Sequence, residues 1–133
     1  RQHYLRELKS LASIKAVDKH ITFTGHRNDL KEIMSVSALV MSLAREPEAF
    51  GRTALEALGL GVPVIAYDHG GASEVLNQMF PQGLVPALDI DAATRRVEDF
   101  YSALPIVPDR MPFALTRMLD STIALYQALS GQQ

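Results

Sequence analysis

The sequence predicts an α/β domain in which a parallel sheet is covered by helices on both faces. Helical and strand patterns alternate along the chain and are joined by connections of only a few residues, as in βαβ units. Two segments, residues 38–43 and 62–67, are short and almost continuously apolar, which is typical of strands buried on both faces of a parallel sheet. No repeat, low-complexity stretch or second domain is evident.

The N-terminal half is expected to alternate helix, strand, helix and strand. The first helix has apolar residues at helical spacing, and the first strand alternates apolar and polar residues. Asn28 is a suitable N-cap for the second helix. The expected elements are a helix over residues 2–16, a strand over 20–24, a helix over 28–36 and a strand over 38–43.

The C-terminal half continues the alternation. Gly61 is expected to stop a helix, and Asp91 is expected to cap another that runs to about residue 104. The other expected elements are a helix over residues 51–60, a strand over 62–67, a glycine loop over 68–71, a helix over 72–77, a loop over 80–88 with a short strand near Leu84 and Val85, a break over 105–112 and a last helix over 113–129.

Composition excludes several classes of protein. A chain of 133 residues is one domain on the usual length prior. The absence of cysteine excludes a disulfide scaffold and thiolate metal sites. Thirteen Lys and Arg against 15 Asp and Glu give a net charge of −2, which argues against a nucleic-acid partner. No apolar run approaches the roughly 18 residues of a transmembrane helix.

The densest set of functional residue types lies in residues 46–56. Gly51 stands at the start of a predicted helix, where free N–H groups and the helix dipole favour an anion and a glycine lets a phosphate approach. Glu56 is five residues further on, or about 7–8 Å along the axis at 1.5 Å per residue. That offset suits a nucleotide with its diphosphate at the helix start and its ribose hydroxyls on the carboxylate.

An alternative explanation is purely structural. Arg52 and Glu56 have the spacing of a surface ion pair, and Glu46 and Glu48 complement a helix N-terminus. However, Arg52 in the first turn opposes the helix dipole. A cation there is better explained if an anion binds beside it.

Two further loops follow predicted strands, at the edge where open parallel sheets bind ligands. Gly70 and Gly71 are able to form a backbone anion nest or simply a tight turn. His26 and Arg27 follow the first strand and either contact a base or phosphate or form a polar turn. The acidic pair Asp89 and Asp91 is interpreted as helix capping, and no metal site is predicted.

Four segments together carry a family resemblance. They are residues 21–26 (ITFTGH), residues 48–51 (EAFG) with Glu56, residues 61–66 (GVPVIA) and residues 70–74 (GGASE). They resemble the C-terminal half of retaining GT-B glycosyltransferases, a Rossmann-like domain, and most closely the group 1 (family 4) branch. The resemblance covers about residues 2–104. A more specific resemblance within it is to bacterial enzymes that build cell-surface glycans, including lipopolysaccharide cores.

The resemblance implies roles for particular residues. Glu48 would be the catalytic residue that contacts donor-sugar hydroxyls, and Glu56 would hold the ribose. The amides of Phe50 and Gly51 would face the sugar or the distal phosphate. The remaining donor-binding residues would be Arg52 and Thr53 at the helix start, Gly70 and Gly71, and, near the base, His26 and Arg27.

The resemblance also implies the reaction and the partners. A sugar would move with retention from a UDP-, GDP- or ADP-sugar to a glycan or lipid-linked acceptor, and neither a metal nor a cofactor would be needed. The family's diphosphate-gripping Arg and Lys lie before the start of this chain, as does the acceptor domain. The chain is therefore expected to be a partial donor domain that is inactive alone and binds nucleotide weakly. The expected location is the cytoplasm, including the inner-membrane surface for the full-length protein.

Two other functions remain as alternatives. One is half of a sugar-nucleotide epimerase or a phosphorylase with the same architecture, although no lysine follows Lys31 to hold the phosphorylase cofactor. The other is a nucleotide-binding module without catalysis. A receiver-like signalling domain fits less well, because Asp68 ends a strand but the acidic pair is missing.

Overall fold

The computed structural model describes residues 2–109 and 112–130. The chain forms two compact units, Arg1–Leu30 and Lys31–Gln133, called the N-terminal and C-terminal units below. None of the helices within the described ranges is long and apolar enough to cross a bilayer.

The N-terminal unit contains helix α1 (Gln2–Ile14) and a short 3-10 helix, η1 (Asp18–His20). The prediction of a first helix is confirmed, but the predicted strand over residues 20–24 is wrong. Residues 21–25 have no regular structure, and no strand of the described residues pairs with them. The alternation that places Ile21 and Phe23 on one side of the segment is typical of a strand, but a strand also needs a hydrogen-bonded neighbour.

The C-terminal unit is built on three parallel strands in the order β1-β2-β3. They are β1 (Val40–Ser42), β2 (Val64–Tyr67) and β3 (Leu84–Val85). Ser42 stands opposite Ala66 at the end of β1, and Tyr67 stands opposite Val85 at the end of β2. The three strands predicted in this part of the chain are confirmed, with the first two shorter than expected.

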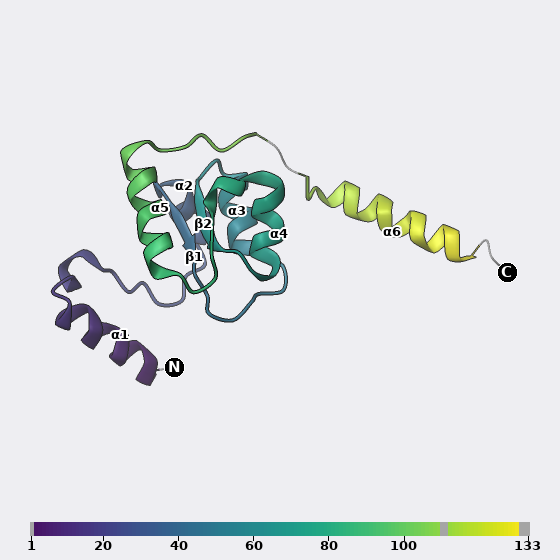
Figure 1. The fold of residues 1–133 in the computed structure, drawn as a ribbon. Helices are drawn as coiled ribbons and strands as arrows, with labels where there is room; N and C mark the ends of the chain where they lie inside the picture. Colours follow the sequence, from purple (N-terminus) through teal and green to yellow (C-terminus); the bar gives the residue numbers. More distant parts are fainter. Residues whose placement is uncertain (1, 110–111, 131–133) are drawn as a thin grey trace. The chain divides into compact units, whose positions relative to one another are not determined.

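Helices cover both faces of this sheet, as predicted. Figure 1 shows α5 on one side of the strands and α3 and α4 on the other. The bounds of the helices are α2 (Leu30–Ser35), α3 (Arg52–Gly59), α4 (Gly70–Met79), the 3-10 turn η2 (Pro81–Gly83), α5 (Ile90–Ser102) and α6 (Leu115–Ser130).

The core lies between the sheet and its helices. All four residues of β2 are buried, as expected of a central parallel strand. Phe80, Leu76 and Val75 follow or belong to α4 and are fully buried, and the Phe80 ring meets that of Phe100 edge to face at 5.9 Å between centroids. The core therefore fixes α4 firmly against β2.

Several helix starts differ from the prediction. Helix α2 begins at Leu30, so Asn28 does not stand directly before it as the predicted N-cap, and α6 begins at Leu115. Helix α4 begins at Gly70 instead of residue 72, so Gly70 and Gly71 belong to its first turn and not to a loop. Helix α5 is capped by Asp89, whose side chain accepts a hydrogen bond from the Ala92 N–H at 2.8 Å. Asp91, the predicted cap, is an exposed first-turn residue.

Candidate functional site

The candidate site lies where β1 and β2 end. Because the strands are parallel, the loop after β1 and the turn after β2 leave the same edge of the sheet. Between them is a narrow cleft whose lining comes from both segments and from the start of α4. The lining residues are Ser42, Ala44, Glu46, Glu48, Tyr67, His69 and Ala72.

Glu48 is held in this cleft at two points. Its carboxylate Oε1 accepts a hydrogen bond from the Ser42 hydroxyl at 3.1 Å. Its backbone carbonyl accepts one from the Gly71 N–H at 2.8 Å. The side chain is half-buried, so the predicted catalytic residue is fixed in place and is not a mobile surface glutamate.

Glycines allow the loop after β1 to rest directly on the start of α4. A Cβ on Gly71 would lie 2.3 Å from the Phe50 carbonyl carbon and 2.4 Å from the Phe50 Cα. A Cβ on Gly51 would lie 2.7 Å from Ala72 N and Cα. Contacts this close are impossible for any other residue, so the two segments meet main chain to main chain.

The first turn of α3 is uncapped and carries an exposed cation, whereas its N-cap glycine is buried against the start of α4. Its N-cap, Gly51, has φ 78° and ψ 37°, and no side chain caps the helix. Arg52 and Thr53 in the first turn are exposed. Arg52 forms an ion pair with Glu56 at 3.0 Å, with 81% and 47% of the two side chains exposed. The surface pair that sequence reasoning offered as an alternative is thus present, and at this exposure it adds little stability.

The start of α4 is less suited to an anion. Ser73 donates a hydrogen bond to the Asp68 carboxylate, which therefore lies near the first turn. The Gly71 N–H already donates to the Glu48 carbonyl. Of the two helix starts at this edge, α3 offers the better anion site, because it carries a cation in its first turn whereas the Asp68 carboxylate lies near the first turn of α4.

His69 joins the two strand ends. Its Nε2 lies 3.1 Å from the Ala44 carbonyl oxygen, so this nitrogen carries the hydrogen and donates it. The ring also meets Tyr67 edge to face at 5.9 Å between centroids. A half-buried histidine tied to the backbone in this way braces the cleft.

His26 and Arg27 belong to the N-terminal unit, whereas the other predicted site residues belong to the C-terminal unit. The Arg27 Nε donates to Asp29 at 2.8 Å, and a second guanidinium nitrogen contacts the other carboxylate oxygen. The hydrogen bond from Arg27 holds the pKa of Asp29 below its ordinary value, and Asp29 in turn raises the pKa of Arg27. Arg27 is therefore engaged within its own loop.

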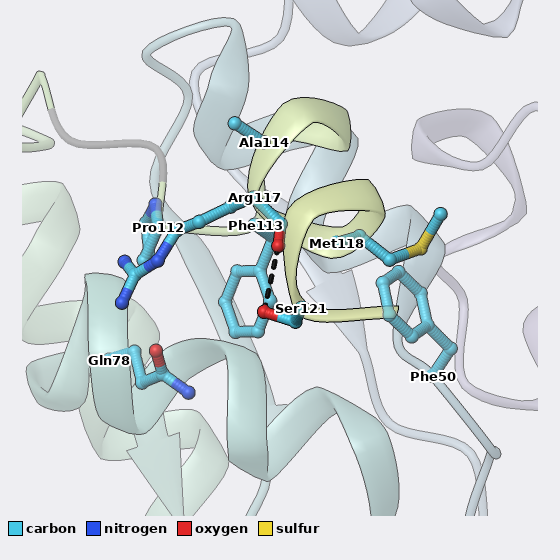
Figure 2. Close-up of a pocket in the computed structure, with 8 residues that line it drawn as sticks. All are labelled: Phe50, Gln78, Pro112, Phe113, Ala114, Arg117, Met118 and Ser121. Carbon is cyan, nitrogen blue, oxygen red and sulfur yellow. Dashed lines mark hydrogen bonds between the residues drawn. The ribbon is translucent and has the colours of Figure 1, made fainter. Parts of the chain in front are cut away.

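Phe50 borders a second, larger pocket of about 300 Å³ beside the start of α6. Figure 2 shows the side chains around it, which come from the loop after β1, from α4 and from residues 112–121. The Phe50 ring, 51% exposed, meets Phe113 edge to face at 6.4 Å between centroids. Of the predicted site residues only Phe50 lines this pocket.

The structure thus gathers Glu48, Gly51, Gly70 and Gly71 around one backbone contact. Phe50 lies in the loop just before α3, and Arg52, Thr53 and Glu56 are exposed residues of the first turns of α3. Among residues 2–109 and 112–130, no three acidic or histidine side chains gather closely enough to hold a metal ion.

Sequence reasoning missed Ser42. It is the last residue of an apolar strand, and such a position was assigned to the core. The available signal is that one polar residue, Ser42, interrupts the apolar run at its carboxyl end, which is the ligand-binding edge of a parallel sheet.

Comparison with known protein families gives one clear match. Residues 1–106 match the family described as glycosyl transferases group 1. The matched segment covers the sheet, the cleft and most of the helices described above.

Curated relatives and a solved structure agree with this match. A GDP-mannose-dependent alpha-(1-6)-phosphatidylinositol monomannoside mannosyltransferase of Mycobacterium tuberculosis is 31% identical over 115 residues, 80% of this chain and 29% of the relative. The lipopolysaccharide core biosynthesis mannosyltransferase LpsB of Rhizobium meliloti is 29% identical over 134 residues, 92% of this chain and 38% of the relative. The crystal structure of Anabaena Alr3699/HepE in complex with UDP matches 76% of this chain and 28% of its own, with a TM-score of 0.70 and 26% identity.

Proposed function

Because the chain belongs to the group 1 glycosyl transferases, we propose that it forms the donor-binding part of an enzyme that transfers a sugar from a nucleotide-sugar with retention and without a metal. The match spans 29% of the length of the Mycobacterium tuberculosis mannosyltransferase. Binding of a glycan or lipid-linked acceptor is accordingly assigned to other parts of the complete enzyme. We expect this chain alone to be inactive and to bind nucleotide weakly.

The observation that carries the proposal is the start of α3. It has free first-turn N–H groups, no side-chain cap, an exposed arginine and a glycine at the N-cap. A helix N-terminus stabilises a nearby negative charge by about 0.3–1 kcal/mol at the surface and by up to about 2 kcal/mol when partly buried. We therefore assign the donor diphosphate to this helix start.

Two glutamates on either side of that start complete the donor site. Glu48 accepts hydrogen bonds from hydroxyls of the donor sugar, since its half-buried carboxylate lines the cleft. Glu56, about one and a half turns into α3 at 3.6 residues per turn, accepts hydrogen bonds from the ribose diol. Donor binding would then require Arg52 to leave Glu56 and turn to the diphosphate, which is a small cost for so exposed a pair.

The proposed reaction is transfer of the sugar with retention. The bond between the anomeric carbon and the diphosphate oxygen breaks, a new bond forms between that carbon and the acceptor oxygen on the same face of the sugar, and the proton of the acceptor hydroxyl passes to water. The nucleoside diphosphate leaves with an additional negative charge. Oriented N–H dipoles and Arg52 stabilise that growing charge, which is how a fixed polar site lowers a barrier.

Phe50, Gly70 and Gly71 shape the site. The two glycines of α4 let the loop that carries Glu48 lie against the helix. Phe50 lies in the same loop, between Glu48 and Gly51 in the sequence. His26 and Arg27 are assigned to the nucleotide base on the family resemblance.

The test is a titration of the 133-residue chain with GDP, UDP and ADP, followed by amide chemical shifts. One of the three nucleotides is expected to bind, with its largest shifts in residues 48–56. Glu56→Ala is expected to weaken that binding by about ten- to a hundredfold, because the ribose hydroxyls would lose their hydrogen bonds to a charged acceptor. Because this variant also frees Arg52, any residual electrostatic effect would strengthen anion binding and cannot explain the loss.

Glu98→Ala is the matched control, since it removes the same charge from an exposed helical position on α5. It should leave the affinity unchanged. Equal affinities of wild type and Glu56→Ala, in chains with intact spectra, would refute the ribose assignment. Absence of nucleotide binding at millimolar concentrations would refute the donor-site proposal for this chain.

A further inference from the structure

A serine at the end of β1 touches the residue on which sugar recognition depends. The Ser42 hydroxyl donates to the Glu48 Oε1 at 3.1 Å, and both side chains are half-buried and line the same narrow cleft.

Ser42 is rigidly placed by the sheet. It is paired with Ala66 of the fully buried strand β2, so its Cα and Cβ are fixed by the core. The main chain of Glu48 is fixed separately, by the hydrogen bond from the Gly71 N–H at 2.8 Å. The serine therefore adds a second anchor that acts on the Glu48 side chain alone.

Such an anchor matters because a free glutamate side chain has several rotamers. Rotamer freedom that is lost on folding need not be lost again when a ligand binds. The hydroxyl occupies one lone pair of one carboxylate oxygen, which leaves the second oxygen and further lone pairs able to accept hydrogen bonds from sugar hydroxyls. The arrangement orients the carboxylate without consuming its capacity to bind.

We propose that Ser42 is a positioning residue that holds the Glu48 carboxylate in the orientation that receives the donor sugar. This inference rests on the proposed function, because it presumes that Glu48 contacts the sugar. It makes a distinct claim: Ser42 affects recognition of the sugar and leaves recognition of the nucleotide unchanged.

The experiment compares two probes, GDP and GDP-mannose, titrated into the 133-residue chain. Ser42→Ala is expected to weaken GDP-mannose binding by about three- to tenfold, the effect of one net hydrogen bond, while the affinity for GDP stays the same. Ser42→Thr keeps the hydroxyl on a β-branched residue suited to a strand, and should restore the affinity for GDP-mannose. If UDP or ADP is the nucleotide that binds, UDP-glucose or ADP-glucose replaces GDP-mannose.

Two controls separate positioning from general stability. Ser37→Ala removes another half-buried hydroxyl, which donates to the Ile33 carbonyl at 2.7 Å and does not line the cleft, and it should change neither affinity. In a Glu48→Ala background, Ser42→Ala should cause no further loss of GDP-mannose binding, because the carboxylate it orients is gone.

Three results would overturn the role of Ser42. They are an unchanged affinity for GDP-mannose in Ser42→Ala, an equal loss for GDP and GDP-mannose, or a loss that persists in the Glu48→Ala background. Failure of the proposed function looks different, since no nucleotide would then bind to the wild-type chain or respond to Glu56→Ala. In that case the assignment of Ser42 falls with it.

Discussion

Replacing Gly71 by alanine tests whether the main-chain contact between the loop after β1 and α4 shapes the site. The new Cβ would lie 2.3, 2.4 and 2.6 Å from three backbone atoms of Phe50. These atoms belong to the backbone and cannot rotate away as a flexible side chain would. The loop must therefore move until the closest of these distances reaches at least about 3.0 Å.

The free-energy cost is the difference between two opposing effects. Alanine is preferred to glycine inside a helix by about 1 kcal/mol. Overpacking of this kind usually costs about 1–3 kcal/mol. The net loss of unfolding free energy is thus about 0–2 kcal/mol, so Gly71→Ala is expected to fold while its loop is displaced.

The effect on the site is expected to exceed the effect on stability. Moving Phe50 and Gly51 shifts the start of α3 relative to Glu48 and lengthens the 2.8 Å hydrogen bond between the Gly71 N–H and the Glu48 carbonyl. Misplacement of a reacting group by about 1 Å reduces rates by roughly a hundredfold, and we expect nucleotide affinity to fall at least about tenfold.

The assay combines urea unfolding, amide shifts and the same nucleotide titration. Gly59→Ala is the control, because it places the same methyl group at an exposed helical position of α3, and it should be neutral or slightly stabilising. Wild-type affinity in Gly71→Ala, with unchanged amide shifts for residues 48–51 before ligand is added, would show that the main-chain contact does not hold the loop.

Three further predictions concern stability and charge. Phe80→Ala removes a fully buried ring and should lower the free energy of unfolding by about 3–5 kcal/mol in urea denaturation. Asp89→Ala removes the cap of α5 and should cost about 1 kcal/mol, with Asp91→Ala as the nearby control that costs less. Arg27→Gln should raise the pKa of Asp29 toward its ordinary value, as followed by carboxyl carbon shifts. Because the folded pKa of Asp29 is lowered, the stability from this pair is present above the ordinary pKa and lost as the pH falls through the lowered one.

The strand β2 was predictable because its burial on both faces appears in the sequence as an apolar run. The same signal indicated β1, although β1 is not buried on both faces, since Met41 is 50% exposed. The run that contains β2 is apolar on both faces, and its four strand residues are all buried. The segment 20–24 was not predictable in the same way. Its alternation indicates a strand, but pairing depends on a neighbour that no local pattern reveals, and in this structure the segment is unpaired.

The candidate site was predictable in its residue types and less so in its contacts. Spacing alone placed Glu48 and Glu56 around a helix start. The role of Gly71 depends on Phe50, about 20 residues earlier in the chain, and a contact of that kind cannot be inferred from a dipeptide. The prediction of a backbone anion nest therefore did not account for the hydrogen bond that the Gly71 N–H already donates to the Glu48 carbonyl.

The contact between the loop and α4 also bears on how this site tolerates change. Its geometry is defined by backbone atoms of Glu48, Phe50 and the α4 glycines, whereas Glu46 and Ala49 in the same loop are exposed. Substitutions at those exposed positions alter what the loop presents to a ligand without altering where the loop lies. Under the proposed function, such a separation would let substitutions change the choice of donor sugar while the position assigned to the diphosphate is preserved. A library randomised at these two positions is thus a reasonable starting point for changing donor choice.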